Sequence, residues 1–206
     1  MIRYSYIYNR VLECYSNMPH ITFPIEPEYI ITGIPNVRML SYSRMTAMHN
    51  CSIEDVILVC QSRSGCTNYD CINDRYLLIW NDDTSENIAA RRRWTKAHEL
   101  GHIMLKHLLI KAGVPISETC SSSTVSPEFE TEADIFAATL LSPMPLFQIL
   151  NITSQSDIMR VFGLSAEASR NRWMEYQKWN YYHRKTAWEC DLRRLYVDNQ
   201  QIAQRA

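Results

Sequence analysis

The chain has 206 residues and a formal net charge of −1 at pH 7. This length suits one domain, or one domain with a helical appendage, and the near-neutral charge gives no general attraction to nucleic acid or to anionic membranes. No apolar run approaches the roughly 18 residues of a membrane span, and the first residues lack a signal peptide's apolar core. We therefore expect a cytoplasmic protein that contacts neither membranes nor nucleic acid directly.

Four segments before residue 85 have recognisable patterns. Apolar spacing predicts a helix over residues 3–17, and alternation predicts a strand over residues 37–42. Ser52 and Asp55 are typical of a capped helix start. One or two strands are expected over residues 66–81, of which the last ends at Trp80. Between the first helix and the first strand, prolines predict a short helix and turns.

The segment His98–His102 reads H-E-x-x-H within residues 91–109, which have helical spacing. Residues four apart share a helix face, so His98 and His102 can reach one metal ion. Glu99 lies about 100° round the helix, where its carboxylate can act as a base toward a water molecule. A zinc ion with an open coordination position can bind and activate such a water molecule at neutral pH, so that the water hydrolyses a substrate. The motif therefore predicts a hydrolytic zinc site.

An apolar stripe runs beside the two histidines and predicts that this helix is buried against a sheet or other helices. Gly101 lowers helix stability by about 1 kcal/mol relative to alanine, so we expect it to make room for a neighbouring backbone or for the metal ligands. The stripe consists of Ala97, Leu100, Gly101, Met104 and Leu108.

A catalytic zinc needs a third protein ligand. The H-E-x-x-H-x-x-G-x-x-H pattern is excluded, because Leu105 and Leu108 stand at the glycine and histidine positions. His107 lies five residues after His102 and is predicted to point elsewhere. Downstream, a second helix is expected from Ser126 to Pro143, with a helix-capping serine at its start.

Three glutamates in this second helix, Glu128, Glu130 and Glu132, compete for the ligand position. Acidic residues in a first turn also suit the helix dipole. Glu130 and Asp134 are four apart and share a face, so Asp134 can orient a histidine beside a ligating Glu130. Glu132 points away from that face. The pattern favours Glu130 over Glu132.

These two helices resemble those of the ImmA/IrrE family of metallo-endopeptidases. Residues 93–105 read R-W-T-K-A-H-E-L-G-H-I-M-L, where the family typically shows R-F-T-x-A-H-E-x-G-H. Residues 130–143 read E-T-E-A-D-I-F-A-A-T-L-L-S-P, against E-x-[EQ]-A-[ND]-x-F-A-x-x-L-L-x-P. The resemblance covers about residues 76–143. Trp94 and Ser142 depart from the usual Phe and Met, and neither position touches the chemistry.

The resemblance implies that His98, His102 and Glu130 bind one Zn²⁺ per chain and that Glu99 is the catalytic base. It also implies a zincin-like α+β fold, in which the active-site helix packs on a small, mostly antiparallel sheet followed by C-terminal helices. We expect a metallopeptidase domain over residues 1–145 and a helical extension over residues 146–206.

Members of the family act on helix-turn-helix repressors, so the implied substrate is a cytosolic repressor of a mobile element or stress regulon. We expect an extended substrate to join the strand ending at Trp80, or its hairpin partner. The alternative is a non-proteolytic metal protein that regulates by binding a repressor or DNA. An intact Glu99 argues against it, because a structural metal site needs no base.

Two further features leave alternatives open. The seven cysteines include no C-x-x-C pair, which favours reduced cytosolic thiols. A second zinc site formed by Cys60, Cys66 and Cys71 is the alternative. Residues 156–173 have the outline of a helix-turn-helix. The aromatic residues at 173, 176 and 179 are better explained by core packing than by base stacking.

Overall fold

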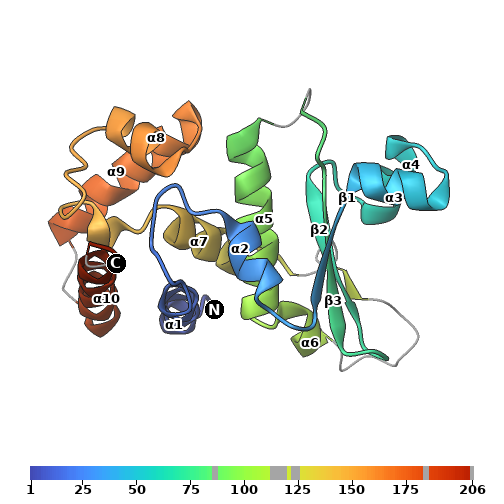
Figure 1. Ribbon diagram of the computed structural model, residues 1–206, viewed down its shortest axis with the longest axis horizontal. Helices are drawn as coiled ribbons and strands as arrows, with labels where there is room; N and C mark the ends of the chain where they lie inside the picture. Colours follow the sequence, from blue (N-terminus) through green and yellow to red (C-terminus); the bar gives the residue numbers. More distant parts are fainter. Residues whose placement is uncertain (85–87, 112–119, 122–125, 183–185, 205–206) are drawn as a thin grey trace. The chain divides into compact units, whose positions relative to one another are not determined.

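The computed structural model describes residues 1–84, 88–111, 120–121, 126–182 and 186–204 (Figure 1). The chain forms two compact units, of which the first contains Met1–Arg3 and Glu26–Ala137 and the second Tyr4–Ile25 and Ala138–Ala206. The first unit holds the sheet and the H-E-x-x-H helix, and the second is helical where it is described. The α+β fold with C-terminal helices is confirmed. The domain division between residues 145 and 146 stays a prediction.

The sheet of the first unit has the strand order β1-β3-β2-β4. β1 pairs with β3 in parallel, whereas β2 is antiparallel to both β3 and β4. Two of the three pairings are thus antiparallel, as predicted. The strands are β1 (Val37–Ser41), β2 (Gly65–Asp70), β3 (Arg75–Trp80) and β4 (Cys120–Ser121).

The helices of the first unit include one that the sequence did not predict, α3, which follows β1 directly. Ser41 caps it by accepting a hydrogen bond from the backbone N–H of Arg44, and the buried ring of Tyr42 anchors it. The predicted capping box of α4 is present between Ser52 and Asp55. These helices are α2 (Pro27–Thr32), α3 (Tyr42–His49), α4 (Ile53–Cys60), α5 (Ala89–Met104), α6 (His107–Lys111) and the first part of α7 (Pro127–Leu141).

The predicted single helix over residues 91–109 is two helices. α5 ends at Met104, and α6 begins at His107. Between them, Lys106 adopts a left-handed backbone with φ 58°. A non-glycine residue in this region breaks the helical path, so α6 takes a direction that the periodicity did not predict.

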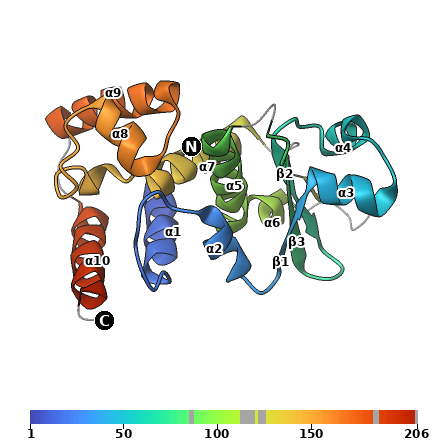
Figure 2. The ribbon, with the colours of Figure 1, turned by 45° about the horizontal axis from the view of Figure 1, so that its top comes forward.

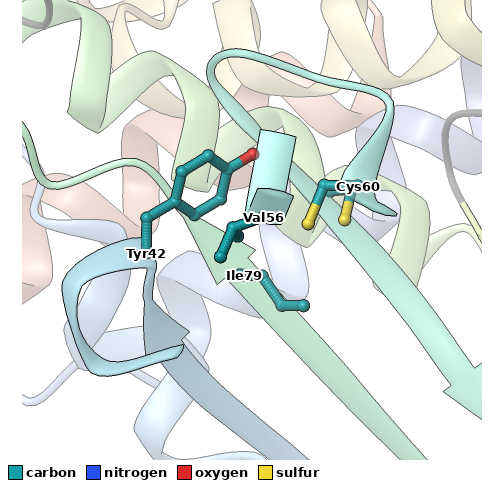
Figure 3. Close-up of a cluster of buried hydrophobic side chains, with 5 residues drawn as sticks. Tyr42, Val56, Cys60 and Ile79 are labelled. Atoms are coloured by element: carbon teal, nitrogen blue, oxygen red, sulfur yellow. The ribbon is translucent and has the colours of Figure 1, made fainter. Parts of the chain in front are cut away.

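The sheet is covered on both faces, by α5 on one and by α3 and α4 on the other (Figures 1 and 2). Side chains alternate along a strand, which separates Leu78 from its neighbour Ile79. Figure 3 shows Ile79 packed with Tyr42, Val56 and Cys60. The α3–α4 pair therefore closes one face with its own small core and leaves the other to α5.

Two glycines allow α5 to approach its neighbours closely. A Cβ on Gly65 would lie 2.8 Å from Thr95 Cγ2 of α5 and 2.6 Å from the Ile79 carbonyl oxygen. A Cβ on Gly101 would lie 3.2 Å from the Ala133 Cα of α7. The expectation that Gly101 makes room for a backbone is confirmed. Close approach of α5 and α7 brings their polar faces to one site.

The second unit packs its helices around aromatic residues and a buried arginine. Arg172 of α9 donates hydrogen bonds of 3.0 and 2.8 Å to the Ser142 carbonyl oxygen, just after α7 ends. Tyr176 contacts the rings of Trp173 and Trp179, as core packing predicts. The helices are α1 (Tyr4–Ser16), the 3₁₀ helix η2 (Met144–Leu146), α8 (Gln155–Phe162), α9 (Ala166–Tyr182) and α10 (Ala187–Ala203). None of the described helices is long and apolar enough to cross a membrane.

Candidate metal centre

α5 and α7 bring three potential metal ligands together. His98 Nε2 lies 3.1 Å from His102 Nε2 and 3.2 Å from Glu130 Oε2, and His102 Nε2 lies 3.5 Å from Glu130 Oε1. Among the described residues, this is the one group of three or more His, Cys, Asp or Glu side chains that could hold a metal ion. It consists of the residues that the sequence favoured.

The spacing of these atoms fits a small tetrahedral ion. Zinc binds imidazole nitrogen and carboxylate oxygen at about 2.0–2.2 Å, which separates neighbouring ligand atoms by roughly 3.3–3.5 Å in a tetrahedron. The three observed distances are close to that range. Two imidazoles and one carboxylate are also a common donor set of catalytic zinc sites. The residues therefore fit a zinc ion.

The pKa shifts of two of these groups, Glu130 and His98, agree with this fit. Burial by itself raises the pKa of Glu130, but hydrogen bonds with His102 and His98 outweigh it and lower the pKa to about 2. Burial lowers the pKa of His98, but hydrogen bonds with Asp134 and Glu130 outweigh it and raise the pKa to about 10. These shifts show that the surroundings of the group favour a positive charge next to the carboxylate of Glu130, as a metal ion would supply.

Asp134 contacts the more exposed histidine, His98. Its Oδ1 lies 2.9 Å from His98 Nδ1, so His98 can donate this hydrogen and direct its Nε2 toward His102 and Glu130. The side chains are 17% exposed for His98 and 58% for Asp134. This contact is the one predicted from the four-residue spacing of Glu130 and Asp134.

The fully buried histidine, His102, has a partner that the sequence did not suggest. His107 Nδ1 lies 3.0 Å from His102 Nδ1, and His107 Nε2 lies 3.0 Å from Glu132 Oε2. Burial lowers the pKa of His107 to about 4, so its ring is neutral near pH 7. The prediction that His107 points elsewhere is wrong: it faces His102 because the chain turns at Lys106, although it is not in the group of potential metal ligands. The only sequence signal was a third histidine near the motif.

Glu132 is turned away from the ligand group and toward the N-terminal segment. Arg3 donates to it from its backbone N–H at 2.8 Å and from Nε and Nη2 at 3.0 and 2.5 Å. Burial by itself raises the pKa of Glu132, but the hydrogen bonds from Arg3 outweigh it and lower the pKa to about 2. Glu128, the third candidate, is exposed and pairs with the N-terminal amino group.

Glu99 lies on the wall of a cleft beside the ligand group. The cleft has a volume of about 550 Å³, and its lining includes His98, Glu99, Glu130 and Asp134. Glu99 is 5% exposed, and its Oε2 has no hydrogen-bond partner. A buried carboxylate oxygen without a partner is costly, so the site needs a further donor here. A water molecule held at the ligand group would supply it.

The start of β2 and the preceding loop form another wall of this cleft, through Gln61, Ser62, Ser64 and Gly65. β3, which ends at Trp80, has strands on both sides. It therefore has no edge that a substrate strand could join, and of the two predicted strands only its hairpin partner β2 reaches the cleft.

The alternative second zinc site finds no support in the described residues. Cys60 and Cys66 are buried in the core between the sheet and α4, whereas Cys71 is exposed. The three cysteines do not form a metal-ligating group. The cysteines at positions 14, 51, 60, 66, 71 and 190 form no disulfide with one another.

α5 presents two histidines and a glutamate beside a small mixed sheet, and α7 adds Glu130, which is an arrangement compatible with a zincin-like metallopeptidase. Residues 63–174, just over half of the chain, match the peptidase family described as the IrrE N-terminal-like domain. The chain belongs to this family, and the ImmA/IrrE resemblance is confirmed. No curated protein matches the chain.

Proposed function

We propose that the protein is a zinc-dependent endopeptidase that binds one Zn²⁺ per chain through His98, His102 and Glu130. A bound zinc ion would lower the pKa of a water molecule and polarise the scissile carbonyl. Glu99 takes the proton of the attacking water and passes it to the leaving amine. The peptide bond is broken between carbonyl carbon and nitrogen, and the water supplies the new carboxylate oxygen.

The observation that carries this proposal is the buried Oε2 atom of Glu99. This atom has no hydrogen-bond partner, although Glu99 lies next to the group of three potential metal ligands. A purely structural metal site needs no such group, and the desolvation of an unused carboxylate would only lower stability. The cleft of about 550 Å³ is large enough for several side chains of an extended peptide. This arrangement favours hydrolysis over a binding role alone.

The proposed substrate is a cytoplasmic helix-turn-helix repressor of a mobile element or stress regulon, and the proposed site of action is the cytoplasm. The support is family membership together with a cleft that is open to a polypeptide. Cleavage of the repressor would relieve the repression of the genes it controls. We propose no direct contact with nucleic acid.

Glu99→Gln separates this proposal from the non-proteolytic alternative. Gln keeps the size of the side chain but cannot accept the proton, and removal of a general base costs about 10² to 10⁴ in rate. We expect bound zinc and thermal stability near wild type, with loss of repressor cleavage on a gel. Exposed Glu167→Gln is the matched control and should cleave normally.

The same variants can be compared in cells with a reporter controlled by the helix-turn-helix repressor that the wild type cleaves in the gel assay. Glu99→Gln should leave the reporter repressed, whereas wild type and Glu167→Gln should relieve it at matched expression. Full derepression by zinc-loaded Glu99→Gln would contradict the peptidase proposal and favour a binding function.

A further inference from the structure

His102 and His107 face each other through the same ring atom. Their Nδ1 atoms lie 3.0 Å apart, and both side chains are completely buried. Two ring nitrogens at this distance need one hydrogen between them, and no water competes for it. Either His102 donates to His107, which leaves a lone pair on His102 Nε2, or the direction is reversed. Only the first direction suits a metal ligand.

The contacts behind His107 select this direction. Glu132 accepts hydrogen bonds from the backbone N–H, Nε and Nη2 of Arg3, so its carboxylate is ionised and can only accept. His107 Nε2, 3.0 Å from Glu132 Oε2, must therefore donate. A neutral imidazole carries one N–H, which makes His107 Nδ1 an acceptor for the hydrogen of His102 Nδ1.

We propose that His107, Glu132 and Arg3 form a positioning chain that holds His102 in the tautomer whose Nε2 is free to bind metal. The chain runs from Arg3 through α7 to the residue after the α5–α6 break. The inference rests on the proposed function, because it takes His102 as a metal ligand. It goes further by assigning His107 as a positioning residue and by linking residue 3 to metal affinity.

Two features distinguish this chain from ordinary packing. Packing alone is satisfied by the stack of the His107 ring on Phe129, whose centroids lie 4.4 Å apart with an interplanar angle of 2°. That stack does not require the polar edge of His107 to align with His102 on one side and Glu132 on the other. Moreover, Arg3 donates hydrogen bonds to both carboxylate oxygens of Glu132. These bonds hold the negatively charged carboxylate in its position facing His107.

The first test measures zinc affinity by competition with a chromophoric chelator. His107→Phe keeps an aromatic ring against Phe129 but removes both nitrogens, and we expect zinc affinity to fall by about 10- to 100-fold. The same substitution at exposed His49 is the matched control and should leave affinity unchanged. His107→Gln retains an acceptor and should recover part of the loss. Wild-type affinity in His107→Phe would overturn the proposal.

Glu132→Gln, which keeps the side-chain size, covers the case in which His107→Phe does not fold. It should weaken zinc binding by about tenfold, and wild-type affinity in this variant would equally overturn the proposal. A merely structural role predicts a lower melting temperature of the metal-free variants without any change in zinc affinity.

The second test needs no metal. Nitrogen-15 NMR of the metal-free protein should place the hydrogen of His102 on Nδ1 and that of His107 on Nε2, and His107→Phe should remove the preference at His102. A hydrogen on His107 Nδ1 in the wild type would overturn the positioning chain. By contrast, failure of the wild type to bind zinc would contradict the proposed function and leave these tautomers as the test of the chain.

Discussion

The two histidines of the candidate metal centre are held in different ways. On the open side, His98 meets the exposed carboxylate of Asp134, and water can replace that contact. On the buried side, His102 meets His107, Glu132 and Arg3 in succession, where water has no access to the two imidazoles. An unpaired polar group costs most where it is buried. Two histidines of one motif therefore depend to different degrees on the residues around them.

The largest effects should come from the ligands themselves. His98→Ala and His102→Ala should both lose most bound zinc, because each removes one of three protein donors. In the metal-free state only His102→Ala should be strongly destabilised, by about 1–3 kcal/mol, since it leaves the buried Nδ1 atom of His107 without a hydrogen-bond partner. Zinc content by mass spectrometry and chemical denaturation with chelator measure the two effects. Stoichiometric zinc in both variants would refute the ligand assignment.

Glu130→Ala and Glu132→Ala should differ in kind, although both are glutamates of α7. Glu130→Ala should lose zinc as the histidine variants do, with little change in metal-free stability, because Glu130 is 44% exposed. Glu132→Ala should retain stoichiometric zinc at saturating metal but unfold more easily, because Arg3 and His107 lose their acceptor. If Glu132→Ala lost zinc and Glu130→Ala lost stability instead, Glu132 rather than Glu130 would be the metal ligand.

In the metal-free protein, the free energy of unfolding should depend on pH with opposite signs at His107, on the buried side, and at His98, on the open side. His107 has a folded pKa of about 4, below the unfolded value of about 6.5. The unfolded state therefore binds more protons between these values, and stability falls as pH falls from 6.5 to 4, by at most about 1.4 kcal/mol per pH unit. His107→Phe should remove this part of the slope in denaturation series with chelator.

His98 should contribute the opposite dependence. Its folded pKa is about 10, so the folded state keeps a proton that the unfolded state loses, and stability falls as pH rises from about 6.5 to 10. Solvent screening at exposed Asp134 should make this slope shallower than the full one-proton value. His98→Ala should flatten it. An unchanged alkaline slope in that variant would show that the proton is held elsewhere.

The smallest effect is expected for Asp134→Asn. The amide oxygen can still accept the hydrogen of His98 Nδ1, and water can reach this exposed position, so zinc affinity should fall less than about tenfold. This is less than the loss predicted for His107→Phe on the buried side. The chelator competition assay compares the two directly. A larger loss for Asp134→Asn would mean that the open side controls the orientation of the ligands.

Local patterns in the sequence were sufficient for the parts of the site that depend on helix periodicity. The spacing of His98 with His102, and that of Glu130 with Asp134, sets common faces whatever the surroundings. The strands over residues 37–42 and 66–81 and the capping box at Ser52 were likewise predictable. In each case the signal and the structure lie within one turn or one strand.

The tertiary structure alone determined what lies beyond the reach of periodicity. A continuous helix would turn His107 away from His102, and only the left-handed backbone of Lys106 brings them together. No pattern in the sequence pairs Arg3 with Glu132, because their contact depends on how distant segments pack. α3 was missed because the burial of Tyr42 against the sheet and α4, rather than helical periodicity, fixes where it lies. Helix faces are set by covalent geometry, whereas the buried support of His102 is set by packing between segments.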